Sequence, residues 1–347
     1  MTLEQYGWSV TWEAAFLASG AGGVPGRVIA QHRSGYRIVT SAGEVTALPS
    51  GRLRREGGVE DVPAVGDWVV LEETRIVAVL PRRTAFERRA AGTEHHSQVV
   101  AANIDQVWVV STVGQGLNPR RLERYVAVAW ESGATPLVVL TKSDTITDPI
   151  AEVASARLVA PGVDVVIVSA ANGDGIEELR TRLGPGETIV LLGPSGVGKS
   201  TLVNTLAGRE ILATAAIGDD GRGRHTTTHR ELVPLANGAM LLDTPGMREL
   251  GLWHADAGLD LAFADIAALA AECRYRDCRH QAEPGCAVLD AVSRRTLEAG
   301  RLESWQKLQR EAAWIASLED PLLARERRLS DRAVAKLAAN RIRDKGR

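Results

Sequence analysis

An eight-residue stretch from Gly193 to Ser200 constrains this chain more than any other feature of its sequence. It reads Gly-Pro-Ser-Gly-Val-Gly-Lys-Ser and fits the phosphate-loop pattern G-x-x-x-x-G-K-[ST] at every fixed position. An apolar strand expected over 188–192 precedes it and a helix expected over 201–207 follows it, as the pattern requires. The chain should therefore contain an α/β domain that binds nucleotide phosphates at a helix N-terminus.

The residue types of this loop predict separate roles. Backbone N–H groups freed by the glycines turn toward phosphate oxygens, Lys199 reaches the β and γ phosphates, and Ser200 ligates magnesium. About 40 residues later, Asp243-Thr-Pro-Gly246 ends another apolar strand, where Asp243 can hold the magnesium shell and Gly246 can approach the γ phosphate. The predicted phosphate-binding residues are Gly193, Pro194, Ser195, Gly196, Val197, Gly198, Lys199, Ser200, Thr201, Asp243 and Gly246.

A base-reading segment is predicted at Thr141, Lys142, Ser143 and Asp144. The Asp144 carboxylate can accept two hydrogen bonds from guanine, whereas adenine offers no such pair, so this position selects GTP over ATP. Lys142 would lie across the ring, and the backbone at Ser169 and Ala170 would meet the guanine oxygen. Taken alone, T-K-S-D more often begins a capped helix.

The surrounding pattern alternates apolar strands with helices. Strands are expected over 106–113, 136–141, 165–169 and 240–243, with a helix over 119–132 that Asn118 caps. This alternation predicts a parallel sheet covered on both faces and extending to about residue 253. Beyond residue 258 the chain reads as helices over 259–272, 287–299 and 301–318, followed by a basic tail from residue 325.

The N-terminal part lacks this alternation of strands and helices. Short strands expected over 27–30, 36–40, 44–48, 68–71 and 76–79 are separated by glycines, which suggests a small β-barrel. Arginines gather in and after this stretch, and a five-stranded barrel with arginines on one side is a common nucleic-acid module. The alternative is a barrel with a solvated charged face. The arginines are Arg27, Arg33, Arg37, Arg52, Arg54, Arg55, Arg82, Arg83, Arg88 and Arg89.

All three cysteines lie in one short stretch with a histidine between them. Cys273, Cys278, His280 and Cys286 provide three thiolates and one imidazole, which satisfy a closed tetrahedral zinc site. With no open position, such a metal would be structural. The alternative is three buried free thiols near an unrelated histidine.

Composition excludes several protein classes. The 347 residues carry a net charge of −2, so the chain is not basic throughout, although local basic faces remain compatible with nucleic-acid binding. No apolar run approaches the roughly 20 residues of a membrane span, and the N-terminus does not resemble a secretory signal. We therefore expect a cytoplasmic protein with no membrane partner.

The order of the motifs points to a family. The base-reading motifs at Thr141 and Ser169 precede the phosphate loop, whereas GTPases usually begin with that loop. Such an order indicates a circularly permuted GTPase. Together with the barrel, the cysteine cluster, and the stretches Ala101-Ala-Asn-Ile-Asp-Gln106 and Asn118-Pro-Arg-Arg-Leu-Glu-Arg-Tyr125, the chain resembles the ribosome small-subunit-dependent GTPase A family over nearly its whole length.

The resemblance implies a multi-domain architecture and a ribosomal partner. An N-terminal extension and OB-type barrel would span 1–95, a circularly permuted α/β P-loop GTPase domain 96–256, and a helical zinc-binding domain with a basic tail 257–347. The implied activity is GTP hydrolysis during late maturation of the small ribosomal subunit, stimulated by that particle and its rRNA. We expect a monomer that carries one structural zinc and uses magnesium with GTP.

Two positions depart from the usual GTPase pattern. Thr141 stands where many GTPases have asparagine, so the amide contact to the base is lost while selection by Asp144 remains. Met247 stands where a Ras-like GTPase has the glutamine that orients water. The resemblance points to His225 for that role, with packing as its alternative, and one of Thr226, Thr227 and Thr228 would complete the magnesium shell and sense the γ phosphate.

Two other functions compete with this interpretation. An ATP-using P-loop enzyme is disfavoured by Asp144, and nucleotide competition would identify it. A zinc-containing RNA-binding scaffold with weak or vestigial NTPase activity is disfavoured by the intact Lys199, Ser200 and Asp243.

Overall fold

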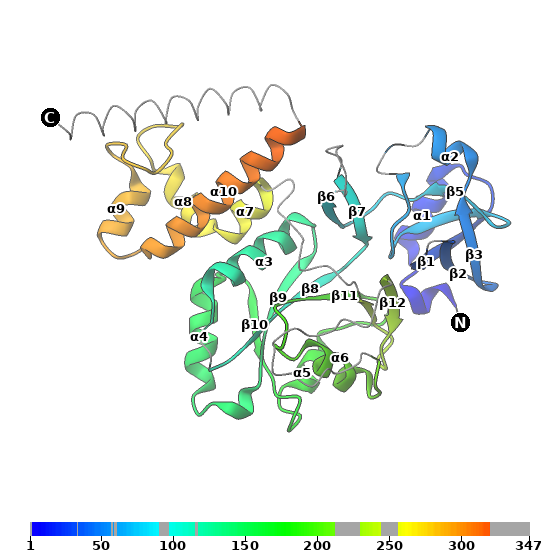
Figure 1. The fold of residues 1–347 in the computed structure, drawn as a ribbon, viewed down its shortest axis with the longest axis horizontal. Coiled ribbons are helices and arrows are strands. Elements are labelled where there is room, and N and C mark those ends of the chain that lie inside the picture. Colours follow the sequence, from blue (N-terminus) through cyan, green and yellow to red (C-terminus); the bar gives the residue numbers. More distant parts are fainter. Residues whose placement is uncertain are drawn as a thin grey trace.

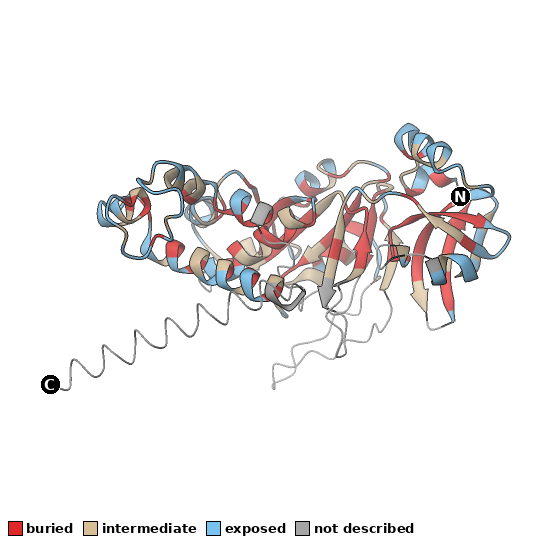
Figure 2. Cartoon of the chain, turned by 90° about the horizontal axis from the view of Figure 1, so that it is seen from above, coloured by how far each residue is buried: buried red, intermediate tan, exposed pale blue. Residues whose placement is uncertain are grey.

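The fold is taken from a computed structural model, which describes residues 2–32, 34–56, 58, 61–89, 97–114, 117–211, 230–243 and 256–319. Three parts follow one another along the molecule: a barrel, an α/β layer and a group of helices (Figure 1). Buried residues line the strands of the first two parts (Figure 2). Within the described ranges, no helix is long and apolar enough to cross a membrane.

The predicted N-terminal barrel is present. Its strands are β1 (Val24–His32), β2 (Gly35–Thr40), β3 (Gly43–Pro49), β4 (Trp68–Glu72) and β5 (Arg75–Val79). They pair in the order β1-β2-β3-β5-β4, and β4 pairs back onto β1, which closes the barrel. Its interior is filled by fully buried apolar side chains that include Val28, Ile38, Val69 and Ile76. The short helix α2 (Gly51–Glu56) follows β3.

Segments outside the predicted barrel strands cover one side of it. The 3-10 helix η1 (Leu3–Tyr6) and helix α1 (Val10–Ser19) precede β1. Trp8 packs edge to face on Trp68 with ring centroids 4.8 Å apart, and Trp12 lies 6.0 Å from the same ring. A separate hairpin of β6 (Ala85–Arg89) and β7 (Ser97–Ala102) leads from the barrel toward the α/β layer.

The α/β layer follows the predicted alternation. Parallel strands β8 (Gln106–Thr112), β9 (Thr135–Thr141), β10 (Asp164–Ile167), β11 (Thr188–Leu192) and β13 (Met240–Asp243) stand in the order β10-β9-β8-β11-β13. The helices of the layer are α3 (Pro119–Glu131), α4 (Pro149–Val159), α5 (Ile176–Thr181) and α6 (Lys199–Ala207). Asn118 Oδ1 accepts a hydrogen bond from the Arg121 N–H at 3.1 Å, which confirms the predicted cap of α3.

The expectation of a wholly parallel sheet was wrong at one edge. β12 (Arg230–Pro234) lies antiparallel to β13, because the short turn over 235–239 can join only antiparallel neighbours. The other side of β12 pairs with β1, where Ala30 faces Glu231 and Gln31 faces Arg230. The sheet of the α/β layer therefore continues into the barrel.

The C-terminal part is helical, but its boundaries differ from those predicted. The expected helix over 259–272 is two helices, α7 (Asp256–Ala262) and α8 (Ala264–Ala271), separated at the buried Phe263, whose φ of −121° and ψ of 41° are not helical. α9 (Ala287–Ser293) ends before residue 299 because Arg295 adopts a positive φ of 61°. α10 (Ala299–Glu319) spans the last predicted helix.

Not every barrel arginine lies on a nucleic-acid face as predicted. Arg27 is only 2% exposed, because its guanidinium packs into the junction between barrel and α/β layer. Arg37 pairs with Glu44 and Glu231, and Arg82 pairs with the buried Asp67. Arg52, Arg54 and Arg55 on α2 and Arg83 after β5 are exposed, whereas Arg33 and the side chains of Arg88 and Arg89 lie outside the described residues.

Candidate functional site

The phosphate loop follows β11 directly, and its last two residues, Lys199 and Ser200, begin α6. Gly193 has to lack a side chain, because a Cβ there would lie 2.4 Å from the Val110 carbonyl oxygen. Gly196 and Gly198 adopt positive φ angles of 80° and 93°, the left-handed backbone that glycine provides in loops that surround phosphate groups. The helix dipole of α6 adds a partial positive charge at that point.

Lys199 reaches back over this loop. Its Nζ donates to the carbonyl oxygens of Gly193 at 2.9 Å and Pro194 at 2.7 Å. The ammonium group therefore lies across the loop, where P-loop lysines meet the β and γ phosphates. Ser195 and Thr201 are exposed, while Ser200 is partly buried in the first turn of α6.

The base-reading segment lies at the end of β9, and Ser143–Thr145 forms one turn of 3-10 helix there. Ser169 is fully buried and its hydroxyl donates to Asp144 Oδ1 at 2.5 Å. This contact orients the Asp144 carboxylate, so the two predicted guanine-binding segments meet. Ser169 and Ala170 stand beyond β10, which ends at Ile167 rather than at the predicted residue 169. The Ser169 hydroxyl also accepts from the Ala171 N–H at 3.2 Å.

Thr141 and Lys142 connect the base-reading segment to the phosphate loop. The Thr141 Oγ1 lies 2.7 Å from the Val197 carbonyl oxygen and 3.1 Å from that of Ser111. Lys142 Nζ donates to the Gly196 carbonyl oxygen at 3.2 Å. The sequence interpretation placed Thr141 in the base-reading segment, with a lost amide contact to the base, and missed these contacts to the phosphate loop, which no local pattern signals.

Part of the predicted site lies outside the described residues. This applies to His225, Thr226, Thr227, Thr228 and Gly246, and to the side chain of Asp243. The backbone of Asp243 closes β13, which is adjacent to β11 and its phosphate loop. The strand thus ends on the same edge of the sheet as β11, as a magnesium-side aspartate requires.

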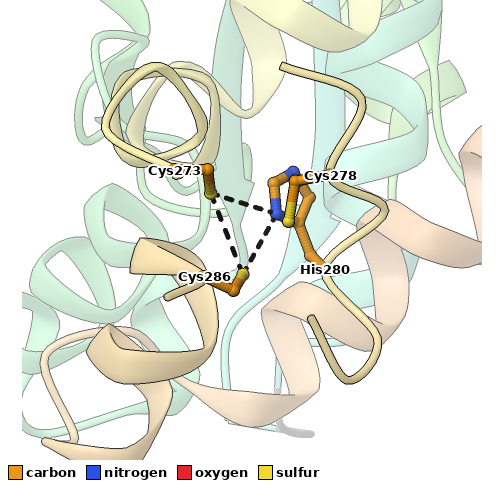
Figure 3. Close-up of side chains that lie close together, drawn as sticks. All are labelled: Cys273, Cys278, His280 and Cys286. Atoms are coloured by element: carbon orange, nitrogen blue, oxygen red, sulfur yellow. Dashed lines mark hydrogen bonds between the residues drawn. The ribbon is translucent and has the colours of Figure 1, made fainter. Parts of the chain in front are cut away.

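The four predicted metal ligands gather in one place (Figure 3). Their ligand atoms all lie within 4.8 Å of one another. Cys273 Sγ is 3.8 Å from Cys286 Sγ, and His280 Nδ1 is 3.6 Å from Cys273 Sγ and 3.3 Å from Cys286 Sγ. A tetrahedral zinc ion bound at ordinary lengths would separate two sulfurs by about 3.8 Å and a sulfur from a nitrogen by about 3.6 Å. The residues therefore fit a metal of this geometry.

Protonation in this cluster also favours a cation. Burial, followed by the neighbouring Cys286 and Cys273, whose thiolates repel a further negative charge, raises the pKa of Cys278 to about 11. Burial at Cys273 is outweighed by hydrogen bonds from the backbone of Val288 and Ala287, which lower its pKa. Burial lowers the pKa of His280, so the imidazole stays neutral at pH 7 and keeps a lone pair for a metal. A divalent cation would remove the repulsion and bind the thiolates.

The cluster is supported by neighbouring segments. His280 is 4% exposed and has a positive φ of 55°, and its carbonyl oxygen accepts from Gln306 Nε2 of α10 at 2.9 Å. The Glu283 carboxylate accepts from the N–H groups of Arg279, Gln281 and Ala282 at 2.8–3.0 Å. These contacts fix the loop that carries two of the ligands.

Comparison with known proteins agrees with this geometry. A family model described as RsgA GTPase matches residues 79–253. The chain belongs to the RsgA GTPase family. Two relatives that bear the name small ribosomal subunit biogenesis GTPase RsgA resemble this chain over most of its length. The protein from Opitutus terrae is 45% identical, and the match covers 94% of each chain. RsgA 2 from Lactiplantibacillus plantarum is 44% identical, and the match covers 90% of each chain.

Solved structures agree in fold. The crystal structure of YjeQ from Thermotoga maritima matches with a TM-score of 0.63 at 25% identity, covering 83% of this chain and 98% of that one. The structure of YloQ, described as a circularly permuted GTPase, matches with a TM-score of 0.59 at 22% identity, covering 84% of this chain and 95% of that one.

Membership in the RsgA GTPase family establishes the activity, which is hydrolysis of GTP to GDP and phosphate. It also confirms the predicted family and the permuted order of the motifs. The strands that carry the base-reading motifs come before β11 in the chain: these are β9 and β10, preceded by β8. In the sheet, β8 nevertheless lies directly beside β11. The nucleotide motifs therefore meet at one edge, whichever of them comes first along the chain.

Proposed function

We propose that this GTPase binds the small ribosomal subunit and its rRNA during late assembly, and that the bound particle stimulates hydrolysis. The names of the relatives support the ribosomal role. The exposed arginines of α2 supply a basic surface suited to phosphate groups. We further propose a cytoplasmic monomer without a membrane partner, divided into a barrel part at 1–95, a GTPase domain at 96–256 and a zinc-binding helical domain at 257–347.

One observation carries the proposal of stimulation: β12 belongs to both the barrel and the nucleotide domain. It pairs with β1 on one side and with β13, which ends at Asp243, on the other. β12 also begins at Arg230, two residues after Thr228. A ligand that shifts the barrel strand β1 therefore acts on β12. This strand connects the proposed switch segment that ends at Thr228 with the strand that ends at Asp243.

The proposed GTP contacts are those the motifs predict. Asp144 would accept from the guanine edge, Lys142 would lie on the ring, and the backbone at Ser169 and Ala170 would meet the guanine oxygen. The phosphate loop from Gly193 to Thr201 would surround the phosphates, with Ser200 and Asp243 holding magnesium and Gly246 near the γ phosphate. When bound, the magnesium ion would supply positive charge that offsets the charge developing on the phosphates.

His225 is proposed to position the attacking water, because Met247 cannot do so. Thr226, Thr227 or Thr228 would complete the magnesium shell. Particle binding would bring His225 toward the water, so the free enzyme should turn over slowly, at roughly 10⁻⁴ to 10⁻² per second.

Single-turnover hydrolysis with purified small or large subunits tests this proposal. We expect stimulation by small subunits alone. His225→Ala should lose most of the stimulated rate while keeping GTP affinity and subunit binding, whereas Lys199→Ala should lose both basal and stimulated turnover. If His225→Ala is stimulated as strongly as the wild type, another group positions the water. Equal stimulation by both subunits would overturn the choice of partner.

Base selection is tested separately. Asp144→Asn should weaken GTP binding relative to other nucleotides, because the amide cannot accept two hydrogen bonds from guanine. An unchanged preference for GTP in competition would show that Asp144 does not read the base.

The metal is proposed to be one structural zinc ion held by Cys273, Cys278, His280 and Cys286. Three sulfurs and one imidazole nitrogen are a typical zinc donor set. Metal analysis of the purified protein should find about one zinc per chain. Cys278→Ser should release it and unfold the C-terminal helices first, since the ligand Cys286 is the N-cap of α9. A metal-free protein with an unaltered fold would contradict this assignment.

A further inference from the structure

We propose that Glu283 and Gln306 are positioning residues of the cysteine and histidine cluster, and that they act on metal binding through the backbone of His280. Gln306 belongs to α10, outside the short stretch that carries the ligands. The metal affinity therefore depends on the docking of α10 as well as on the four ligands. The inference rests on the proposed zinc assignment and adds two residues to that site.

The four ligands do not receive the same support from secondary structure. Cys273 lies just beyond the end of α8, and Cys286 is the N-cap of α9. Cys278 and His280 instead lie between these two helices, in a loop without helix or strand. Metal ligands are held in place by the groups that hydrogen-bond around them. The two loop ligands therefore need such contacts more than the two ligands at the helix ends.

His280 is the one ligand of the four with a positive φ angle. Its φ of 55° is a left-handed conformation that an L residue adopts only at an energetic cost. In this conformation its Nδ1 lies 3.3 Å from Cys286 Sγ and 3.6 Å from Cys273 Sγ, facing both sulfurs (Figure 3). A return of the backbone to the right-handed region would turn the ring away from them.

The peptide that follows His280 is held from both sides. Its carbonyl oxygen accepts from Gln306 Nε2 at 2.9 Å, and the N–H of Gln281 donates to the Glu283 carboxylate at 2.8 Å. In a trans peptide these two groups point in opposite directions, so the two bonds together fix the rotation of the peptide about the Cα–C bond of His280. Glu283 also accepts from the Arg279 N–H at 3.0 Å, which holds the chain just before the ligand.

Helix α10 connects this peptide to the α/β layer. Next to Gln306, the ring of Trp305 lies 5.4 Å from the His280 ring. On the same helix, Arg301 donates to Glu123 of α3 at 3.0 Å. Because His280 is buried, water cannot readily replace the Gln306 donor. The position of α10 on α3 thus decides whether the His280 carbonyl keeps its partner.

Loss of either partner should weaken metal binding although all four ligands remain. Gln306→Leu leaves a buried carbonyl without a donor, and Glu283→Gln replaces one accepting oxygen by an NH₂ group that cannot accept. Each should weaken zinc binding about 10- to 100-fold, the usual effect of losing a group that orients a metal ligand. Gln309→Leu is the matched control on α10. Its side chain makes no hydrogen bond to any described residue, so the zinc affinity should stay within about twofold.

The test is equilibrium competition for zinc between the full-length chain and a colorimetric chelator. His280→Ala keeps three thiolates, and adding Gln306→Leu to it should weaken zinc binding no further, because the proposed effect passes through His280. A residue that stabilises the fold alone would give additive losses. Circular dichroism identifies any variant that does not fold, and Glu283→Gln carries the test if Gln306→Leu fails in this way.

Two results would overturn the inference. One is a zinc affinity of Gln306→Leu equal to that of Gln309→Leu, and the other is an additive loss in the variant that combines His280→Ala with Gln306→Leu. A wild-type chain that binds no zinc is a different result, because it would refute the zinc assignment itself.

Discussion

Two buried arginines join the α/β layer to its neighbours, and they use opposite chemistry. Arg27 of β1 donates to neutral acceptors: the carbonyl oxygens of Tyr6, Gly66 and Asn103 and the hydroxyl of Thr188. Arg301 of α10 donates to the carboxylates of Glu123 and Asp265 at 2.6–3.0 Å and to the carbonyl oxygens of Val159 and Ala262. Each also lies over an aromatic ring, Trp68 for Arg27 and Phe263 for Arg301.

The pKa values of the two guanidinium groups reflect this difference. Burial lowers the pKa of Arg27 to about 10, which still leaves it charged at neutral pH. Burial also opposes the charge of Arg301, but hydrogen bonds and charge from Asp265 and Glu123 outweigh it and raise the pKa. The barrel junction therefore depends on the planar guanidinium of Arg27, whose several N–H groups reach separate acceptors. The junction with the C-terminal helices depends on the ion pairs of Arg301 with Glu123 and Asp265.

The largest effect should follow from Arg301→Met. The substitution leaves Glu123, whose side chain is 3% exposed, as a buried carboxylate without its cation, which costs about 3–5 kcal/mol. Urea unfolding should show this loss, with the C-terminal helices unfolding first. Arg294→Met at the C-cap of α9 is the matched control: its pair with Asp290 is exposed, so the change should stay below about 1 kcal/mol.

Arg27→Met should cost less, about 1–3 kcal/mol, because it leaves unpaired carbonyl groups but no buried charge. The same urea experiment measures it. If this variant loses as much stability as Arg301→Met, the proposed contrast between shape and charge does not hold.

Lysine substitutions sharpen the contrast. Arg301→Lys keeps a cation beside two carboxylates and should recover about half of the stability lost in Arg301→Met. Arg27→Lys keeps the charge but cannot reach acceptors on four different segments, so it should recover little of its loss. Similar recovery at both positions would mean that charge alone matters at each junction.

The smallest effect concerns pH. Burial is the largest cause of the raised pKa of Glu123, and it outweighs the lowering by Ser304 and Arg301. A carboxyl group with a raised folded-state pKa favours the folded protein most below its unfolded pKa, here 4.5, and that contribution is lost as pH rises through the folded pKa. The free energy of unfolding of wild type relative to Glu123→Gln should therefore fall as the pH rises above 4.5. A difference that is constant or rises with pH would contradict the shift.

Glu123 and Arg124 show how a sequence resemblance can hide a structural role. Both lie in the stretch 118–125, which pointed to the family without indicating what it does. In the fold Glu123 pairs with Arg301, and Arg124 makes two hydrogen bonds to Glu311 at 2.6 and 2.7 Å. One face of α3 thus anchors α10. The stretch 118–125, which carries part of the resemblance, attaches the C-terminal helices to the α/β layer.

The sequence by itself determined the features that depend on neighbouring residues. The phosphate loop, the strand over 188–192, the cap at Asn118 and the four-residue cysteine and histidine cluster are all encoded by short spacings, because each needs only local backbone geometry or a local set of side chains. The structure has a strand at the predicted residues 188–192, the predicted cap at Asn118, and the four cysteine and histidine side chains close together.

Only the tertiary structure decided which distant segments meet. Ala30 faces Glu231 across the β1–β12 pair, Arg27 reaches Thr188, and Thr141 reaches Val197, although none of these partners is near the other in the chain. A buried arginine and an exposed one look alike in a sequence, and a threonine after a strand does not indicate its acceptor. Such contacts arise when apolar faces pack, because every polar group buried in the process then requires a partner.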